Sequence, residues 1–120
     1  IETSRSSSAD AAVNLAGRPS TIVRGEVGGW RAAAGSSFDA IIADPARSGL
    51  GVPGTTALAR IESPVIVLVS CDAASLGRDV KLLAERHYRL AGVELIDAFP
   101  HTTQIEAVSR FEFVPGRQLG

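Results

Sequence analysis

Short apolar runs that alternate with helix-like segments constrain the fold of this chain more than any other feature of its sequence. The longest run, Val65–Val69, has the length of a single strand and follows Pro64. It is followed by a segment in which Leu76, Val80 and Leu83 share one face of a helix. A strand, a helix and a further strand in succession are typical of an open α/β sheet with right-handed crossovers.

The rest of the chain continues this alternation. We expect strands at 1–3, 21–23, 38–44, 65–70, 88–96 and 105–114, and helices at 6–16, 30–34, 55–61 and 76–86. The run 38–44 is almost continuously apolar, which is typical of a parallel strand covered on both faces. The strand at 88–96 is expected to carry a bulge at Gly92, and the last strand alternates polar and apolar residues, which favours an antiparallel strand. The prediction is therefore a mostly parallel α/β sheet with an antiparallel last strand.

Composition sets the broad class. The chain has 120 residues, enough for one domain, with 45% apolar and 21% charged residues. No apolar run approaches the roughly 18 residues of a membrane span. The first ten residues are polar, so they do not resemble a secretion signal, and a single cysteine gives no sign of an oxidising compartment. We therefore expect a cytoplasmic protein. A net charge of −1 argues against nucleic-acid binding by bulk electrostatics alone.

Four chemically active side chains fall where predicted strands end: Glu2, Glu26, Asp44 and Cys71. In open α/β sheets, ligands bind outside the carboxyl ends of the strands. Cys71 also precedes a predicted helix, whose first amide groups can stabilise a thiolate. The alternative is a buried structural thiol. A phosphatase loop is disfavoured, because Arg78 lies one position too far along the chain and the expected glycines are missing.

Glu106 stands in an apolar stretch after a loop rich in polar residues. A carboxylate partly withdrawn from water makes a competent general base, whereas the alternative is an exposed strand residue. Asp44 could accept hydrogen bonds from a ligand, or could simply form an Asp-Pro turn. Lone acids such as Glu2 and Glu26 can bind ribose hydroxyls. One cysteine and two distant histidines do not suit a metal, so no metal site is expected.

Three segments carry a family resemblance. Residues 44–49 read Asp-Pro-Ala-Arg-Ser-Gly, and residues 69–72 read Val-Ser-Cys-Asp, with Arg-Asp at 78–79. Residues 97–106 read Asp-Ala-Phe-Pro-His-Thr-Thr-Gln-Ile-Glu. In this order and spacing, they resemble the motifs of the RNA (uracil-5-)-methyltransferase family, which uses S-adenosylmethionine. The match spans residues 44–108, and residues 1–16 resemble the second strand and helix of the same catalytic domain more loosely.

The resemblance implies a Rossmann-like class I methyltransferase fold that acts on a uridine of tRNA or rRNA. It implies that Cys71 is the nucleophile that adds to carbon 6 of uracil, and that Glu106 is the base that removes the proton from carbon 5. It implies that Glu2, Glu26 and Asp44 contact the methyl donor. The target base would be flipped out of a helix or lie in a loop.

The sequence departs from the family pattern at Ala46, which replaces a proline, and at Gln104, which replaces a histidine. These departures support an alternative, a non-catalytic RNA-binding or assembly module that keeps the fold. The family's first strand and its glycine-rich donor turn are not found in residues 1–120. We therefore expect these residues to form the carboxy-terminal part of one catalytic domain, inactive alone, whose open sheet edges pair with a second copy or close the gap.

Overall fold

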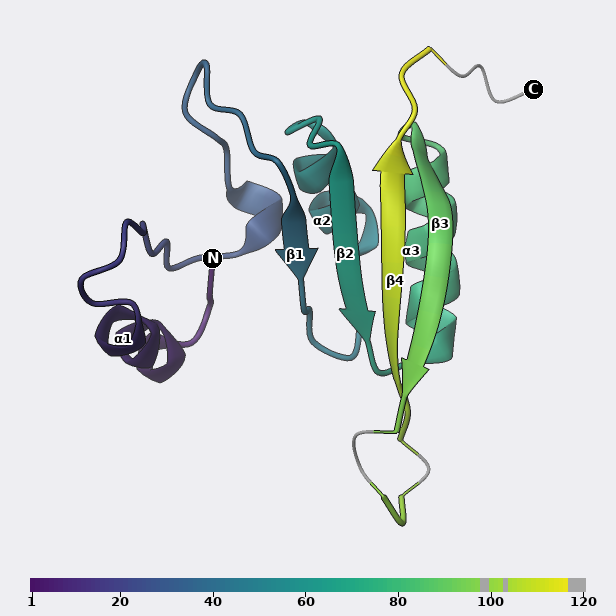
Figure 1. Cartoon of the computed structure of the whole chain (residues 1–120), viewed down its shortest axis with the longest axis horizontal. Helices are drawn as coiled ribbons and strands as arrows, with labels where there is room; N and C mark the ends of the chain where they lie inside the picture. Colours follow the sequence, from purple (N-terminus) through teal and green to yellow (C-terminus); the bar gives the residue numbers. More distant parts are fainter. Residues whose placement is uncertain (98–99, 103, 117–120) are drawn as a thin grey trace.

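The computed structural model of the chain describes residues 1–97, 100–102 and 104–116. Its centre is a four-stranded sheet in the order β1-β2-β4-β3 (Figure 1). The strands are β1 (Ile41–Ala43), β2 (Val65–Ser70), β3 (Tyr88–Ile96) and β4 (Glu106–Phe113). β1 and β2 are parallel, and β4 is antiparallel to both β2 and β3. Three strands thus share one direction and the last runs against them, which confirms the predicted fold class.

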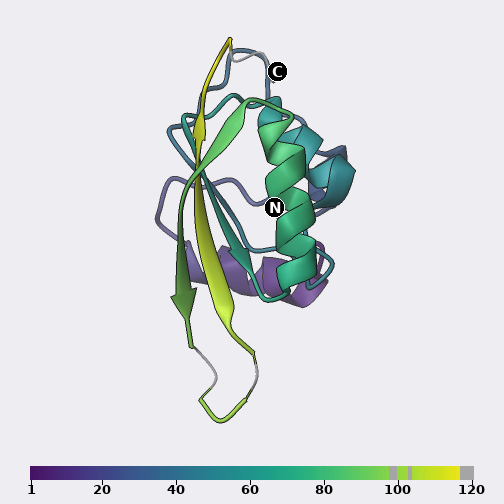
Figure 2. The ribbon, with the colours of Figure 1, turned by 90° about the vertical axis from the view of Figure 1, so that its right-hand side faces the viewer.

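Two helices cover one face of the sheet. Figure 2 shows α2 (Gly51–Ala59) and α3 (Ala73–Ala84) on the same side of the strands. The core lies between these helices and the sheet, and its fully buried members come from every layer: Leu58, Ile66, Leu68, Leu83, Tyr88 and Phe111. Leu76 and Val80 pack against this core, so the predicted apolar face of α3 is confirmed.

We call the opposite side of the sheet the open face; it carries Ile42, Val67, Val69, Val108 and Arg110. These positions follow from strand alternation and register, since Ile42 pairs with Val67, Val67 with Arg110, and Val69 with Val108. Ile42 is 77% exposed. The expectation of a long strand at 38–44 covered on both faces is therefore wrong. Only three residues form a strand, and it lies at the edge of the sheet. An apolar sequence alone does not ensure that another layer packs on both faces of the strand.

The β3–β4 ribbon has the predicted antiparallel pairing. The register of β3 shifts between Leu90 and Gly92, which confirms the expected bulge. Beyond Tyr88, every residue of β3 is exposed. The helix layer therefore leaves most of β3, an edge strand of the sheet, uncovered.

The first forty residues lie beside β1 (Figure 1), and Val27 joins them to the core. α1 (Arg5–Asn14) begins after Ser4, whose Oγ accepts a hydrogen bond from the Ser7 amide, and it has no buried residue. The strands expected at 1–3 and 21–23 reduce to one parallel bridge between Glu2 and Arg24. The helix expected at 30–34 is wrong: a single turn, η1 (Val27–Gly29), forms earlier and ends at Trp30.

Candidate functional site

The carboxyl ends of β1 and β2 and the amino end of β4 meet at one edge of the sheet (Figure 1). This edge follows from strand direction, because β1 and β2 are parallel and β4 runs against them. Three of the predicted site residues belong to this edge. Asp44 directly follows β1, Cys71 directly follows β2, and Glu106 is the first residue of β4.

The register brings Cys71 and Glu106 opposite each other. Ser70 pairs with Ala107 in the antiparallel β2–β4 ladder, so the next step along both strands sets Cys71 against Glu106. The pair formed by Val69 and Val108 lies on the open face, and Glu106, two residues before Val108 in β4, alternates to the same face. Cys71 and Glu106 are both half-buried. Among the described residues, neither side chain has a hydrogen-bond or ion-pair partner, so the thiol and the carboxylate are both available to a ligand.

Asp44 lies one strand away. Ala43 pairs with Leu68, so continuing the parallel register sets Asp44 level with Val69, two residues before Cys71. Its side chain is exposed and has no hydrogen-bond or ion-pair partner in the part of the chain that the structure describes. The three groups thus follow one another across neighbouring strands, in the order carboxylate, thiol, carboxylate.

Asp72 fixes the start of α3 beside the thiol. One of its carboxylate oxygens accepts a hydrogen bond from the Ser75 amide, at 2.9 Å, in the manner of a helix N-cap. Hydrogen bonds from Ser75, together with the charges of Arg47 and Arg78, hold the pKa of Asp72 below its usual value. The Arg47 guanidinium lies 3.8 Å from the other carboxylate oxygen. The residues that follow Cys71 are therefore anchored to the loop that follows Asp44.

Glu2 and Glu26 form a second group. The bridge between Glu2 and Arg24 leaves Glu26 two residues further on, exposed and just before η1. Glu2 accepts a hydrogen bond from the Ser4 amide at 2.8 Å through one carboxylate oxygen. The structure thus brings together Asp44, Cys71 and Glu106, and leaves Glu2 and Glu26 as a pair outside the four-stranded sheet.

Sequence reasoning missed the part played by Asp79. The Arg-Asp pair at 78–79 belongs to the family motif, but its sequence indicates no particular role. In the structure Asp79 is 1% exposed and accepts hydrogen bonds from the amides of Leu50 and Gly51, at 2.7 and 3.0 Å. The sequence contains one indication of this role: Asp79 is next to Val80, on the face of α3 that packs against the core.

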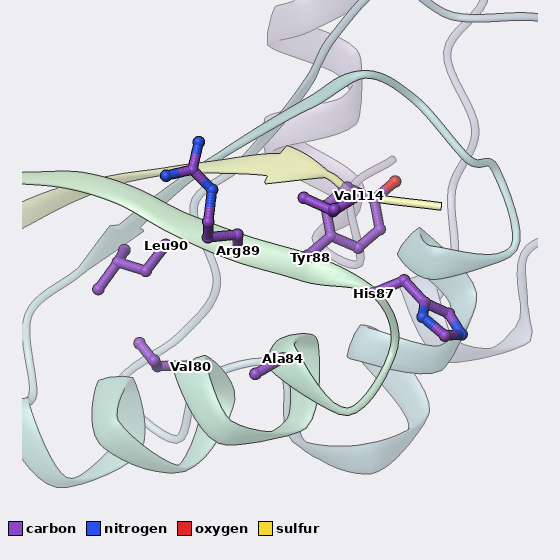
Figure 3. Close-up of a pocket in the computed structure, with 7 residues that line it drawn as sticks. All are labelled: Val80, Ala84, His87, Tyr88, Arg89, Leu90 and Val114. Carbon is purple, nitrogen blue, oxygen red and sulfur yellow. The ribbon is translucent and has the colours of Figure 1, made fainter. Parts of the chain in front are cut away.

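A cavity of about 160 Å³ lies at the other end of the sheet, between α3 and the start of β3. Figure 3 shows its lining, which includes Val80, His87, Tyr88 and Leu90. It is smaller than the roughly 300–1,000 Å³ of typical ligand pockets, and no predicted site residue lines it. We regard it as imperfect packing of α3 on β3. Within the described ranges, no three His, Cys, Asp or Glu residues are grouped to bind a metal, and no helix could cross a bilayer.

Comparison with known proteins gives consistent relatives. No family model matches the sequence. The 23S rRNA (uracil(1939)-C(5))-methyltransferase RlmD of Histophilus somni is 47% identical over 75 residues, which cover 62% of this chain and 17% of the relative. The RlmD protein of Aliivibrio salmonicida is 41% identical over 80 residues, which cover 66% of this chain and 18% of that protein. The chain thus spans about a sixth of the length of these relatives.

A solved structure agrees with the sequence relatives. It is the crystal structure of the Pyrococcus abyssi tRNA (uracil-54, C5)-methyltransferase in complex with S-adenosyl-L-homocysteine, with a TM-score of 0.67 and 31% identity. The superposition covers 86% of this chain and 24% of that one. The predicted resemblance is therefore confirmed: over about two thirds of its length the chain is homologous to the RNA (uracil-5-)-methyltransferases.

Proposed function

We propose that this chain is part of an S-adenosylmethionine-dependent methyltransferase that methylates carbon 5 of a uridine in tRNA or rRNA. The observation that carries the proposal is the β2–β4 register: Ser70 pairs with Ala107, so Cys71 and Glu106 are the next residues at the same edge of the sheet. The homology to uracil-C5-methyltransferases of rRNA and tRNA supports the same reaction.

Cys71 starts the reaction. Carbon 5 of uracil is a weak nucleophile, so the Cys71 thiolate adds to carbon 6 and forms a carbon–sulfur bond. The electron pair of the ring double bond moves onto the carbonyl oxygen, and the resulting enolate makes carbon 5 nucleophilic. Carbon 5 would then bond to the methyl carbon of S-adenosylmethionine, and the electron pair of the broken carbon–sulfur bond would remain on the donor's sulfur. The position of Cys71 just past β2, half-buried and without an internal partner among the described residues, suits a thiol that must reach a ring lying on the sheet edge.

Glu106 completes the reaction. After methyl transfer, carbon 5 holds a proton that must leave before the ring double bond can reform. The Glu106 carboxylate takes this proton, the electron pair restores the double bond, and the Cys71 thiolate is released. A base opposite the nucleophile is needed because both groups act on adjacent carbons of one ring. The β4 strand supplies such a position.

The acidic residues suit the methyl donor. S-adenosylmethionine supplies an electrophilic methyl group on a positively charged sulfur, and it offers hydroxyl and amino groups as hydrogen-bond donors. Asp44 and Glu26 have no side-chain partner in the described part of the chain, and only one carboxylate oxygen of Glu2 is engaged. We assign all three to the donor: free carboxylate oxygens accept hydrogen bonds from ribose hydroxyls in other nucleotide-binding sheets. Asp44 is the one beside Cys71.

We assign residues 1–120 to the carboxy-terminal part of a single catalytic domain. The small share of each relative that the chain spans supports this assignment. Experiments on activity therefore use the parent protein that contains these residues.

Replacement of the nucleophile tests the first step. We expect Cys71→Ala in the parent protein to abolish methylation, because no other described thiol can add to carbon 6. RNA with 5-fluorouridine should form a covalent adduct with the unmodified protein, since fluorine cannot leave as a proton. Mass spectrometry of the digested adduct should locate it on Cys71. Ser70→Ala, whose side chain alternates to the other face, is the control. An active Cys71→Ala protein, or an active protein without the adduct, would refute the mechanism.

Replacement of the base tests the last step. We expect Glu106→Gln to add to ordinary uridine and transfer the methyl group, but to release product slowly, because the amide cannot accept the proton. The protein–RNA adduct should then accumulate on denaturing gels. Glu94→Gln is a matched control, because Glu94 pairs with Val108 on the neighbouring strand. Rapid turnover by Glu106→Gln, with no adduct, would remove Glu106 from the proposed role.

A further inference from the structure

The loop that follows β1 is fastened to α3 by its backbone. Ser75 Oγ donates to the Arg47 carbonyl at 2.9 Å, and an Arg78 guanidinium nitrogen donates to the Ser48 carbonyl at 2.6 Å. The Asp79 carboxylate accepts from the amides of Leu50 and Gly51. Ser75, Arg78 and Asp79 are spaced to lie on one side of a helix. We call these three residues the α3 clamp.

Asp79 caps α2 from another helix. The N-cap residue of α2 is Leu50, whose apolar side chain cannot accept a hydrogen bond from the helix amides. The Asp79 carboxylate therefore satisfies amides at the start of α2, where the helix dipole also favours negative charge. Burying a carboxylate costs several kcal/mol, and the two amides together with the Arg78 guanidinium, 2.9 Å from one Asp79 oxygen, offset this cost. Because Asp79 belongs to α3, its cap on α2 also links the loop after β1 to the helix after β2.

Gly49 shows how closely the loop approaches the clamp. Its φ angle of +74° is in the left-handed region. A Cβ atom there would lie 2.5 Å from an Asp79 carboxylate oxygen and 2.7 Å from an Arg78 guanidinium nitrogen. No side chain fits in that space unless the clamp moves. The contact therefore requires glycine, and it leaves the loop little freedom to shift along α3.

The clamp connects the two segments that carry the site. Asp44 begins the loop on one side, and Cys71 and Asp72 begin α3 on the other. The ion pair between Arg47 and Asp72 adds a link near the thiol, but both side chains are partly exposed and such a pair contributes little. The β1–β2 ladder places Asp44 and Cys71 at the same edge of the sheet, and the clamp contacts fix the loop that follows Asp44 against the helix that follows Cys71.

We propose that Asp79, with Ser75 and Arg78, is a positioning residue for methyl transfer: it holds the loop that follows the donor-binding Asp44 against the helix that follows the nucleophile Cys71. This inference rests on the function proposed above. The reacting carbons must approach to about 3–3.5 Å, and a misplacement of about 1 Å can cost about 100-fold in rate. A loosened loop holds the methyl donor at varying distances from a ring fixed by Cys71. The affinity for RNA does not depend on this distance.

The test compares clamp variants of the parent protein in methyl-transfer kinetics. Asp79→Asn and Ser75→Ala are each expected to lower kcat about 10- to 100-fold and to raise the KM for S-adenosylmethionine, with the KM for RNA unchanged. Ser75→Thr keeps the hydroxyl donor and should restore most of the rate. Ser63→Ala is the stability control, because Ser63 is 1% exposed and donates to Val65 at the opposite end of β2. It should lower the melting temperature without changing either KM.

The outcomes separate this inference from the proposed function. If the unmodified parent methylates no uridine, the proposed function fails and the inference fails with it. If the parent is active but Ser75→Ala and Asp79→Asn keep its kcat and its KM for the donor, only the inference is overturned. The same holds if the clamp variants lose rate only in proportion to their melting temperature, as Ser63→Ala does. If Asp79→Asn does not fold, Ser75→Ala and Ser75→Thr are sufficient to test the inference, because the Ser75 side chain contributes a single peripheral hydrogen bond to the loop.

Discussion

Tyr88 joins the first residue of β3 to the segment before β2. Its hydroxyl donates to the Ser63 carbonyl at 2.8 Å, and its ring packs against Phe113 with ring centroids 5.2 Å apart. Burial, with a smaller contribution from the charge of Glu62, raises the pKa of Tyr88 to about 12. The neutral phenol is thus the form that the fold stabilises.

The titration of Tyr88 can be observed directly, because it is the only tyrosine in the sequence. We expect the tyrosinate absorbance of the folded chain to rise with a midpoint near 12, and that of the chain in concentrated urea to rise near the model value of 10.0. A raised folded pKa means that this contribution to stability is complete below pH 10 and is lost as the pH rises toward 12. Equal midpoints in the two states would contradict the burial of the hydroxyl.

Among the elements, α3 shows how one helix serves both packing and the site. Leu76, Val80 and Leu83 bind it to the core, whereas Asp72 and the α3 clamp bind it to the site edge. Asp72 precedes the helix, where a negative charge interacts favourably with the helix dipole. The stability of the first turn of α3 therefore depends on pH.

We expect this dependence to appear in acid. Because the folded pKa of Asp72 is lowered, its contribution is present above the usual value of 3.8 and is lost as the pH falls below it. Asp72→Asn keeps an N-cap but not the charge, so its melting temperature should lie below that of the unmodified protein at neutral pH and approach it in acid. Thermal unfolding at several pH values measures the difference. A constant difference would show that the charge of Asp72 plays no part.

Element positions were predictable where periodicity decides them. The strands at 65–70 and 88–96 and the apolar face of α3 are where the sequence pattern indicates. The sequence pattern predicts that α2 begins at residue 55, but it begins at Gly51. The difference arises because the residue that caps α2, Asp79, is distant in the sequence. The helix expected at 30–34 failed because local propensity does not determine where a single turn forms beside Gly28 and Gly29.

The identities of the candidate site residues could be predicted from the sequence, but their arrangement in space could not. Cys71 and Asp44 follow recognisable strands, so their common edge could be inferred. That Glu106 faces Cys71 depends on β4 entering between β2 and β3, which no local pattern reveals. The separation of Glu2 and Glu26 from the sheet is likewise a matter of tertiary placement.

At the scale of the whole molecule, β1 forms one edge of the sheet, and the layer that holds Glu2 and Arg24 does not pair with it among the described residues. Unpaired edge strands attract further strands. We propose that residues 1–120 alone use this edge to pair with a second copy. Sedimentation of the isolated chain should show a mass that rises with concentration, and Ile42→Lys, which places a charge on the edge strand, should reduce it. A monomer at all concentrations would contradict the pairing.

The isolated chain should also lack donor affinity. Glu2 and Glu26 lie outside the four-stranded sheet whose edge carries Asp44, and we infer that residues 1–120 alone do not hold a complete donor site. We expect calorimetry with S-adenosylmethionine to give a Kd weaker than about 1 µM, and we expect no methyl transfer. The parent protein is the positive control. Binding tighter than about 1 µM by residues 1–120 would show that they already hold a complete donor site.

Because β4 pairs antiparallel with β2, the effect of an inserted residue on the candidate site depends on where in the chain it is inserted. A residue inserted between β3 and β4 leaves the ladder between Ser70 and Ala107 as it is. A residue inserted within β4 shifts every later side chain to the other side of the sheet or breaks the ladder. The pairing of Ser70 with Ala107 therefore does not depend on the length of the connection between β3 and β4, whereas a single residue gained inside β4 endangers the facing positions of Cys71 and Glu106.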